Sequence, residues 1–273
     1  YRRALQSAVA LCRLRILLVL GTLAVLSAPA AAQEPRVLVY GGDREFPPYE
    51  YLDEQGEPQG FNIQLIRALA RDAGRDIEIR LRPRDERMAE FDAGRTDVTF
   101  LSFSDERAAR YQLLDQTWTL SQVIMMRPGL AHYPRGLDDL WGTRLAVDNG
   151  SINHLLLSNL AESRRPVLHV AATRGDAIRA FERGDVDGVA GNHLTLRFLM
   201  GPLADEATEV PLLSRPYQMA VLKGRDLAVA PLRVALDRLK ASGEFDRLVE
   251  QYLTNPARRT WLDRYASALG LTG

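Results

Sequence analysis

Two hydroxyls, two carboxylates and an arginine lie within six residues of one short segment. The segment SFSDER covers residues 102–107 and directly follows the apolar run VTFL, residues 98–101. A guanidinium placed after a strand can bind an anion, because its planar fork takes both oxygens of a carboxylate at once. Two interpretations of Arg107 are therefore open: an anion anchor at the mouth of a cleft, or one more solvated arginine.

Aromatic residues gather in a second segment, EFPPYEY, residues 45–51. Pro47-Pro48 fixes an extended backbone after a predicted strand, which is where open α/β sheets place their ligands. Phe46, Tyr49 and Tyr51 could offer flat faces at such a cleft. For the two tyrosines, packing beneath the loop is an alternative that the sequence leaves open.

Signatures of metal, phosphate or hydrolase chemistry are missing from the sequence. The histidines lack the paired spacing of metal ligands, and neither a phosphate loop nor a GxSxG elbow occurs. We therefore expect no metal, no cofactor and no catalytic residue. The histidines are interpreted as surface or interface residues: His132, His154, His169 and His193.

The first 32 residues have the order of a secretory signal peptide. A basic run precedes the eleven apolar residues ILLVLGTLAVL (16–26), and small residues then give an Ala30-x-Ala32 cleavage site. A retained membrane anchor is the alternative, but the apolar run is short of the roughly 20 residues that span a bilayer. We predict cleavage after 1–32 and a periplasmic location. The chain opens on Tyr1 rather than Met, so we also expect a fragment edge or a mis-assigned start.

Composition excludes several classes of function for the exported part. Removing four arginines of the signal from 35 basic residues leaves 31 against 35 acidic ones, a net charge near −4. Such a balance gives no electrostatic footprint for nucleic acid. The single cysteine, Cys12, leaves with the signal, so the remaining domain has no disulfide and no thiol chemistry.

Hydrophobic periodicity predicts two α/β units of similar construction. Strand, helix, strand, helix and strand patterns follow one another from 36 to 101, which implies parallel strands covered by helices. The same order starts again at 144–150, and MAEFDAGRTDV resembles AIRAFERGDVDGV in its spacing. Residues 235–253 then predict two helical pieces broken at Gly243. The sequence thus indicates two lobes, each with its own sheet.

Several motifs together resemble the family 3 periplasmic solute-binding proteins. GGDREFPPYEYLDEQGEPQGFNIQLIRALARDAG, AGRTDVTFLSFSDERAARYQLLD, GLDDLWGTRLAVDNGS and GDVDGVAGN occur in the order and spacing of that family, over residues 36–253. The resemblance implies an α/β, two-lobed periplasmic binding protein of type II, a Venus flytrap, with crossing strands near 120–123 and 218–220. The implied domains are lobe 1 (36–121 plus 219–254), lobe 2 (122–218) and a C-terminal tail (255–273).

The resemblance also implies a ligand site, with four of its residues in the first lobe. Phe46 matches the aromatic residue that stacks on the ligand. Asp43 matches a position that reads the ligand's side chain or amine. Ser102 and Arg107 match the hydroxyl and the guanidinium that take a carboxylate.

In the second lobe the match is mixed. Ser151, which opens a predicted helix, fits the position where a hydroxyl and backbone N–H groups take the same carboxylate; a plain helix N-cap is the alternative. Asn192 stands where the family usually has an Asp that pairs with an α-ammonium, and Phe100 stands where many members have Gly or Ser. The resemblance therefore implies a carboxylate-bearing ligand and leaves an amino acid in question.

Three functions follow from the resemblance. The first is an extracytoplasmic protein that captures a small, carboxylate-bearing, amino-acid-like solute for the permease of an ABC importer. The second is the ligand-sensing domain of a transmembrane histidine kinase or diguanylate cyclase, which the Gly191-Asn192 pair resembles. The third is a cyclohexadienyl dehydratase-like enzyme, with Asp43, Glu45 or Glu50 as the acid or base.

Overall fold

The computed structural model describes residues 37–254. The predicted signal peptide (1–32) and the predicted tail (255–273) lie outside the described residues. Within 37–254, no helix is both long and apolar enough to cross a membrane.

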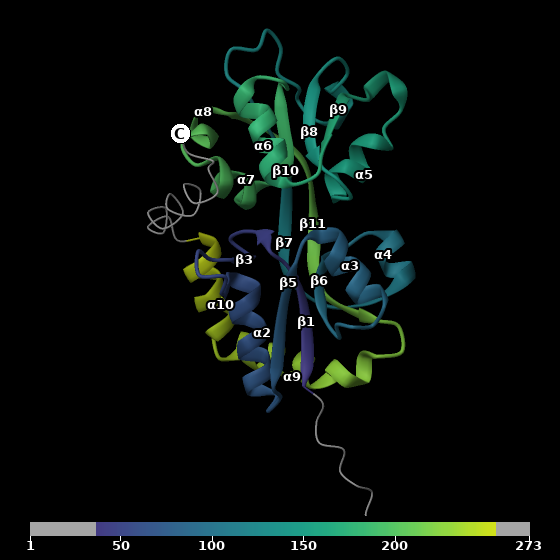
Figure 1. Cartoon of the computed structure of the whole chain (residues 1–273), viewed down its shortest axis with the longest axis vertical. Coiled ribbons are helices and arrows are strands. Elements are labelled where there is room, and N and C mark those ends of the chain that lie inside the picture. The colour runs from purple at the N-terminus through teal and green to yellow at the C-terminus, as the bar shows by residue number, and fades with distance from the viewer. Residues whose placement is uncertain (1–36, 255–273) are drawn as a thin grey trace, which may run out of the picture. The chain divides into compact units, whose positions relative to one another are not determined.

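The first lobe is built on parallel strands covered by helices (Figure 1). β1 (Leu38–Asp43) pairs in parallel with β5 (Ile77–Arg82), and α2 (Phe61–Asp72) connects them, as the strand and helix pattern predicted. A bridge between Tyr40 and Val98 links β1 to the segment before β6 (Thr99–Ser102). The remaining elements of this lobe are β2 (Glu45–Phe46), β3 (Glu50–Leu52), β4 (Pro58–Gln59), α3 (Arg84–Asp92), α4 (Asp105–Arg110), α9 (Asp226–Ala241), α10 (Glu244–Val249) and η4 (Glu250–Thr254).

The second lobe repeats this construction. β8 (Arg144–Asp148) lies between β9 (Val167–Ala171) and β10 (Gly188–Asn192) and is parallel to both. Parallel strands need long connections, and helices supply them here, as the repeated sequence pattern predicted. These helices and turns are η2 (Leu137–Asp139), α5 (Ile152–Ser158), η3 (Glu162–Arg164), α6 (Arg174–Arg183), α7 (His193–Met200) and α8 (Leu203–Glu206).

Two long antiparallel strands connect the lobes (Figure 1). β7 (Tyr111–Met126) pairs with β11 (Thr208–Leu222) along almost its whole length. β7 also pairs with β10 in the second lobe, while β11 pairs with β6 in the first. Ser121 of β7 lies opposite Ser214 of β11. Because of this register, a lobe boundary at residue 121 of β7 lies beside residue 214 of β11. We therefore propose that the chain returns to lobe 1 near residue 214, before the predicted boundary at 218/219.

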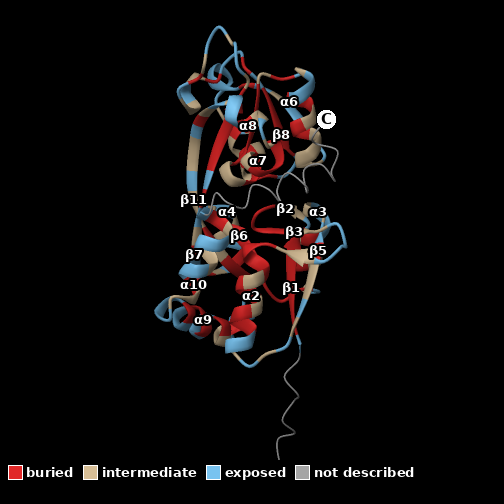
Figure 2. Ribbon diagram, turned by 90° about the vertical axis from the view of Figure 1, so that its left-hand side faces the viewer, coloured by how far each residue is buried: buried red, intermediate tan, exposed pale blue. Residues whose placement is uncertain are grey.

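The inner strands of both lobes and the helix faces that cover them are buried (red in Figure 2), and most of the buried side chains are hydrophobic. Tyr49 and Tyr51, which the sequence left undecided, are both buried, with 1% and 4% of their surface exposed. The Tyr49 ring stacks on Phe46 at 4.7 Å between centroids, and Tyr51 packs 5.9 Å from Phe198 of α7. The packing interpretation is therefore right for both tyrosines, and Tyr51 joins the core of the second lobe.

The start of α2 requires a glycine. Phe61 N donates to Pro48 O at 2.9 Å and Asn62 N donates to Tyr49 O at 2.7 Å, so the loop carbonyls satisfy the first amides of the helix. This close approach places the Cβ of any residue at Gly60 2.5 Å from Tyr49 O, and the φ of Gly60 is 111°.

Replacing Gly60 with alanine should lower the free energy of unfolding by about 2–5 kcal/mol, from backbone strain of ~1–3 kcal/mol and a forced contact of similar size. Gly56→Ala is the matched control, because Gly56 also has a positive φ, 81°, but nothing within 4 Å of an added Cβ. Urea unfolding of both variants measures the difference. Equal losses of unfolding free energy in the two variants would contradict the proposal that a Cβ at position 60 is forced against Tyr49 O.

Candidate functional site

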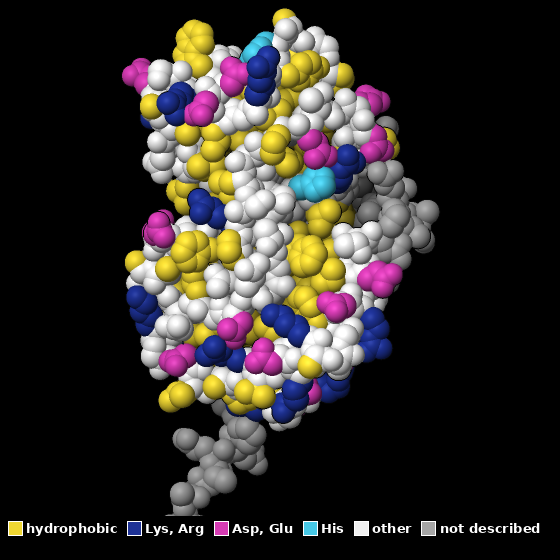
Figure 3. All heavy atoms as spheres, turned by 180° about the vertical axis from the view of Figure 1, so that it is seen from behind, with side chains coloured by type: hydrophobic (Ala, Val, Ile, Leu, Met, Phe, Trp, Pro, Cys, Tyr) yellow, Lys and Arg dark blue, Asp and Glu magenta, His cyan; other side chains and the backbone are white. Residues whose placement is uncertain are grey.

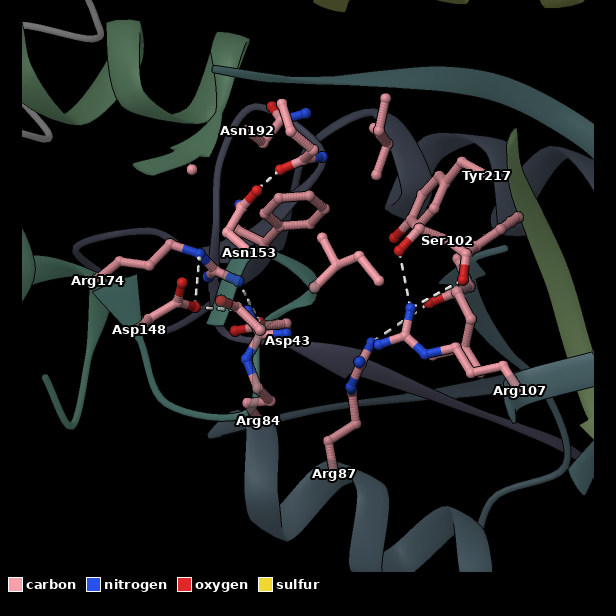
Figure 4. A pocket seen from close by; sticks show the side chains of 18 residues that line it. Asp43, Arg84, Arg87, Ser102, Arg107, Asp148, Asn153, Arg174, Asn192 and Tyr217 are labelled. Carbon is pink, nitrogen blue, oxygen red and sulfur yellow. Dashed lines mark hydrogen bonds and ion pairs between the residues drawn. The ribbon is translucent and has the colours of Figure 1, made fainter. Parts of the chain in front are cut away.

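A pocket lies between the two lobes and is lined by residues of both (Figure 4). Its volume is about 60 Å³, several times the roughly 10–15 Å³ that one water molecule requires. The strands β1, β6, β8 and β10 all end at this pocket, in agreement with the rule that open α/β sheets bind ligands beyond the carboxyl ends of their strands. The pocket can hold a small molecule.

All six residues that the sequence predicted for the ligand site line this one pocket. They come from different elements of both lobes, and the structure brings them together from positions up to about 150 residues apart. Ligand contact by each of them stays a prediction. The six residues are Asp43, Phe46, Ser102, Arg107, Ser151 and Asn192.

Arg107 is held in place by the backbone and side chain of Ser102. Its Nη1 donates to Ser102 O at 2.8 Å and to Ser102 Oγ at 2.7 Å, and its backbone N donates to Ser104 Oγ, the N-cap of α4. Within the described part of the chain, no carboxylate forms an ion pair with Arg107. Burial, together with the nearby Arg87 and Arg84, lowers the pKa of Arg107 to about 10. The guanidinium is thus positioned and charged at neutral pH, with most of its donors uncommitted.

A second arginine, Arg87 of α3, lies deeper in the same wall. Only 6% of its surface is exposed, and its Nη1 is 3.6 Å from Glu50 Oε1. Glu50 is fully buried and accepts from Asp43 N at 2.8 Å, from Asn62 Nδ2 at 3.0 Å and from the Tyr40 hydroxyl. Burial raises the pKa of Glu50, although Arg87 and these donors oppose the shift. Glu50 therefore supports the pocket wall from behind and does not line the cavity.

Four charged residues join the lobes along one side of the pocket. Arg84 of lobe 1 lies 2.7 Å from Asp148 of lobe 2, and Arg174 of lobe 2 lies 3.0 Å from Asp43 of lobe 1. Arg174 is also 3.4 Å from Asp148, so charges of opposite sign alternate. We call these residues, Asp43, Arg84, Asp148 and Arg174, the ionic bridge. A further cavity of about 220 Å³ lies against the same four residues, so the ionic bridge separates it from the pocket.

Electrostatics hold the ionic bridge in its charged form. Burial alone would raise the pKa of Asp43, but Arg174 and Arg84 bring it far below its usual value. For Arg174, burial opposes the charge, while Asp43 and Asp148 raise the pKa. Figure 3 shows charged side chains scattered over one face of the molecule. Ion pairs between exposed side chains, such as Arg233–Asp115 and Arg238–Asp72, are individually weak. The ionic bridge differs in being buried, so removing one of its charges would leave the partner charge buried without compensation.

The wall formed by lobe 2 presents hydroxyl and amide groups. Ser151 Oγ accepts from His154 N at 3.0 Å and caps α5, so its N-cap role is confirmed while its hydroxyl proton is free to donate. Asn192 Oδ1 accepts from Thr195 N at 3.1 Å and caps α7. Asn153 Nδ2 donates to Gln122 Oε1 at 2.8 Å. This side of the pocket is polar and carries no uncommitted carboxylate among the described residues.

Aromatic rings close the remaining part of the pocket. Phe46 lines it and is covered on one face by the Arg174 guanidinium, 4.8 Å from the ring centroid. Phe100, where the sequence departs from the family pattern, is buried and stacks on Tyr217 at 5.6 Å. These rings narrow the cavity beside Arg107.

Several charged residues that share the pocket with Arg107 were not predicted from the sequence. Arg84 follows β5, Asp148 ends β8 and Arg174 follows β9, so each stands at the carboxyl end of a parallel strand. That position was the available signal, since open α/β sheets bind their ligands beyond the carboxyl ends of the strands. Arg87 lies within a helix and gave no comparable signal. In the described residues, no group of three His, Cys, Asp or Glu side chains could hold a metal ion.

Fold and site together define a two-lobed ligand-binding protein of the periplasmic binding protein type II class. The chain belongs to the bacterial extracellular solute-binding proteins, family 3, which it matches over residues 38–255. The predicted family and fold class are thereby confirmed.

Relatives and solved structures agree with this assignment. The chain is 25% identical to a "Probable histidine-binding protein" of Neisseria gonorrhoeae, over 83% of this chain and 86% of that protein. It is also 25% identical to the amino-acid-binding protein AabA of Dichelobacter nodosus, over 80% and 89%. A histidine kinase sensor domain similar to periplasmic binding proteins superposes with a TM-score of 0.73 at 26% identity, over 80% and 96%. An ancestral arginine-binding protein bound to glutamine shares the fold, with a TM-score of 0.70 at 24% identity over 80% and 97%.

Proposed function

We propose that this protein captures a small, carboxylate-bearing polar solute outside the cytoplasm and delivers it to the permease of an ABC importer. The observation that carries the proposal is Arg107, which Ser102 positions at the pocket while no described carboxylate pairs with it. A half-buried guanidinium without an anion is unfavourable, so an acid group of the ligand would satisfy it. Membership of a family of extracellular solute-binding proteins supports a ligand of this size and a periplasmic location.

A thermal-shift screen tests the capture of a carboxylate. A ligand that binds only the native state stabilises it by about 2.7 kcal/mol at a hundredfold excess over Kd, which for a domain of this size raises the melting temperature by roughly 5–10 °C. We expect such a rise with at least one small carboxylate and none with the corresponding amide or alcohol. A screen in which acids and their amides act alike would contradict the proposal.

A sensory role is the second candidate, because the superposition with a histidine kinase sensor domain covers 96% of that domain. The same pocket would then report ligand occupancy to a transmembrane part of the same protein. The coding sequence beyond residue 273 separates the two roles. A membrane-spanning segment followed by a signalling domain would favour the sensor, whereas a neighbouring permease gene would favour transport.

We further propose that the bound solute is not converted. The relatives named above are described as binding proteins, and two of the three carboxylates that could act as acid or base are already engaged. Asp43 lies in the ionic bridge and Glu50 is enclosed by its four partners. Incubation with prephenate or arogenate should give no product, and turnover of either compound would overturn this part of the proposal.

A further inference from the structure

The pocket between the lobes has room for only a few non-hydrogen atoms. Its volume of about 60 Å³ corresponds to about four to six water molecules, at roughly 10–15 Å³ for each. An unsubstituted acid of about two to four carbons has the same number of non-hydrogen atoms. An acid with a long, branched or aromatic chain has many more. The volume therefore favours a short carboxylate, and the walls of the pocket decide whether it can expand.

Phe100 forms an apolar wall of the pocket next to the proposed anion anchor. It lies on β6 two residues before Ser102, and residues two apart on a strand point to the same face of the sheet, about 7 Å from each other. Ser102 accepts from Arg107 Nη1 through both its carbonyl and its hydroxyl oxygen. All three residues line the pocket. A ligand whose carboxylate binds Arg107 therefore has the Phe100 ring close to its chain.

The Phe100 ring has no space to move away from a longer ligand. Only 1% of its surface is exposed, and it stacks on Tyr217 with 5.6 Å between ring centroids and 29° between ring planes. On another side it packs against Tyr40 at 5.8 Å. Tyr217 is held in turn, since its hydroxyl accepts from Asn62 Nδ2 at 3.0 Å. Because protein interiors are close-packed, this wall is rigid.

The ionic bridge closes the pocket in another direction. Figure 4 shows its four residues on one side of the pocket, and Ser102, Arg107 and Tyr217 on the other. The larger cavity of about 220 Å³ lies beyond the ionic bridge. An apolar chain that entered this cavity would have to separate buried charges and deprive them of their partners, which is costly. The chain of the ligand is thus confined to the space that the Phe100 wall limits.

We infer that Phe100 is a specificity-determining residue that restricts the ligand to a carboxylate with a short chain, of about two to four carbons. Its ring occupies the space into which a longer chain would extend from the acid group at Arg107. The inference rests on the proposed function, because it names the substrate class of the same pocket and the residue that selects it.

Two series of carboxylates that differ in the size of the chain test the inference on the wild-type protein. One series is acetate, propionate, butyrate and hexanoate, and the other is glycine, alanine, leucine and phenylalanine. Isothermal titration calorimetry measures the Kd of each compound. We expect the tightest binding at a short member of at least one series. The largest member of that series should have a Kd at least tenfold higher.

Variants at position 100 locate the size limit. Phe100→Ala removes the ring and leaves Arg107 in place, so the ratio of the two Kd values should fall at least tenfold. Phe100→Leu keeps an apolar core residue and should lower the ratio several-fold, and it provides the test if the alanine variant does not fold. Phe91→Leu is the matched control. Phe91 is also fully buried in lobe 1, packs 5.1 Å from Tyr111 and is not part of the pocket lining, so the ratio should equal that of the wild type.

The outcomes separate this inference from the proposed function. If the largest acids bind the wild-type protein as tightly as the short ones, the inference is wrong and carboxylate capture still stands. A preference for short acids that persists unchanged in both Phe100 variants would overturn the role of Phe100. Failure of every acid in both series to bind at millimolar concentration would overturn the proposed function together with the inference.

Discussion

Replacing Arg107 with glutamine should reduce the rise in melting temperature that a carboxylate ligand produces to half or less, while the melting temperature without ligand changes little. The variant loses a charge-assisted contact worth about 1.5–3 kcal/mol, which weakens binding by roughly 10- to 150-fold. At a ligand concentration that gave a hundredfold excess over the wild-type Kd, about half to nine-tenths of the stabilisation then disappears. Differential scanning fluorimetry with and without the best ligand measures both quantities.

Stability without ligand should be nearly unchanged because Arg107 makes no described ion pair, and burial next to Arg87 and Arg84 disfavours its charge. Glutamine keeps a donor for Ser102 and removes that charge. Arg110→Gln is the matched control: Arg110 is in the same helix but is exposed and pairs with Asp92 at 2.9 Å. It should retain the full ligand response. A collapse of the ligand-free Arg107→Gln protein would instead identify Arg107 as a structural residue.

Local patterns in the sequence predicted the elements around this arginine well. Apolar periodicity gave the parallel strands and their helices, because strands such as β1 and β10 are buried along their whole length and helices such as α2 and α6 bury one face. Glycines marked helix ends at Gly74, Gly184 and Gly243, where the structure has positive φ angles. These features depend on neighbouring residues, which a sequence shows directly.

Charged partners were predicted less well, because they depend on how two lobes face each other. Arg174 contacts Asp43 from a position 131 residues away, and Arg84 contacts Asp148 across 64 residues. The sequence spacing around these residues does not indicate in which lobe the partner of each one lies. Asp43 was correctly placed at the pocket, but its carboxylate is already engaged: Oδ1 accepts from Glu45 N and Oδ2 from Arg174. We therefore propose that Asp43 joins the lobes, while its contact with a ligand amine stays a prediction.

Breaking the Asp43–Arg174 contact should lower the free energy of unfolding by about 3–5 kcal/mol, because Arg174→Gln leaves a buried carboxylate without its nearest cation. Arg84 lies 3.9 Å from the same carboxylate and compensates only in part. The double variant Asp43→Asn/Arg174→Gln should recover some of the loss. The resulting coupling energy is expected to be about 1–3 kcal/mol, measured by denaturant unfolding of the four proteins in the cycle.

The exposed pair Asp72–Arg238 is the control that separates the effect of burial between the lobes from the effect of a short distance between the charged atoms. Its atoms are 2.7 Å apart, closer than the 3.0 Å of Asp43–Arg174, but its side chains are 30% and 57% exposed and both belong to lobe 1. An exposed pair contributes about 0–1 kcal/mol, so the same cycle at this pair should give a small coupling energy. Equal coupling energies for the two pairs would mean that burial between the lobes adds nothing to the attraction between the two charges. A larger value for the buried pair would show that Asp43 and Arg174 attract each other across the two lobes more strongly than an exposed pair of the same fold does.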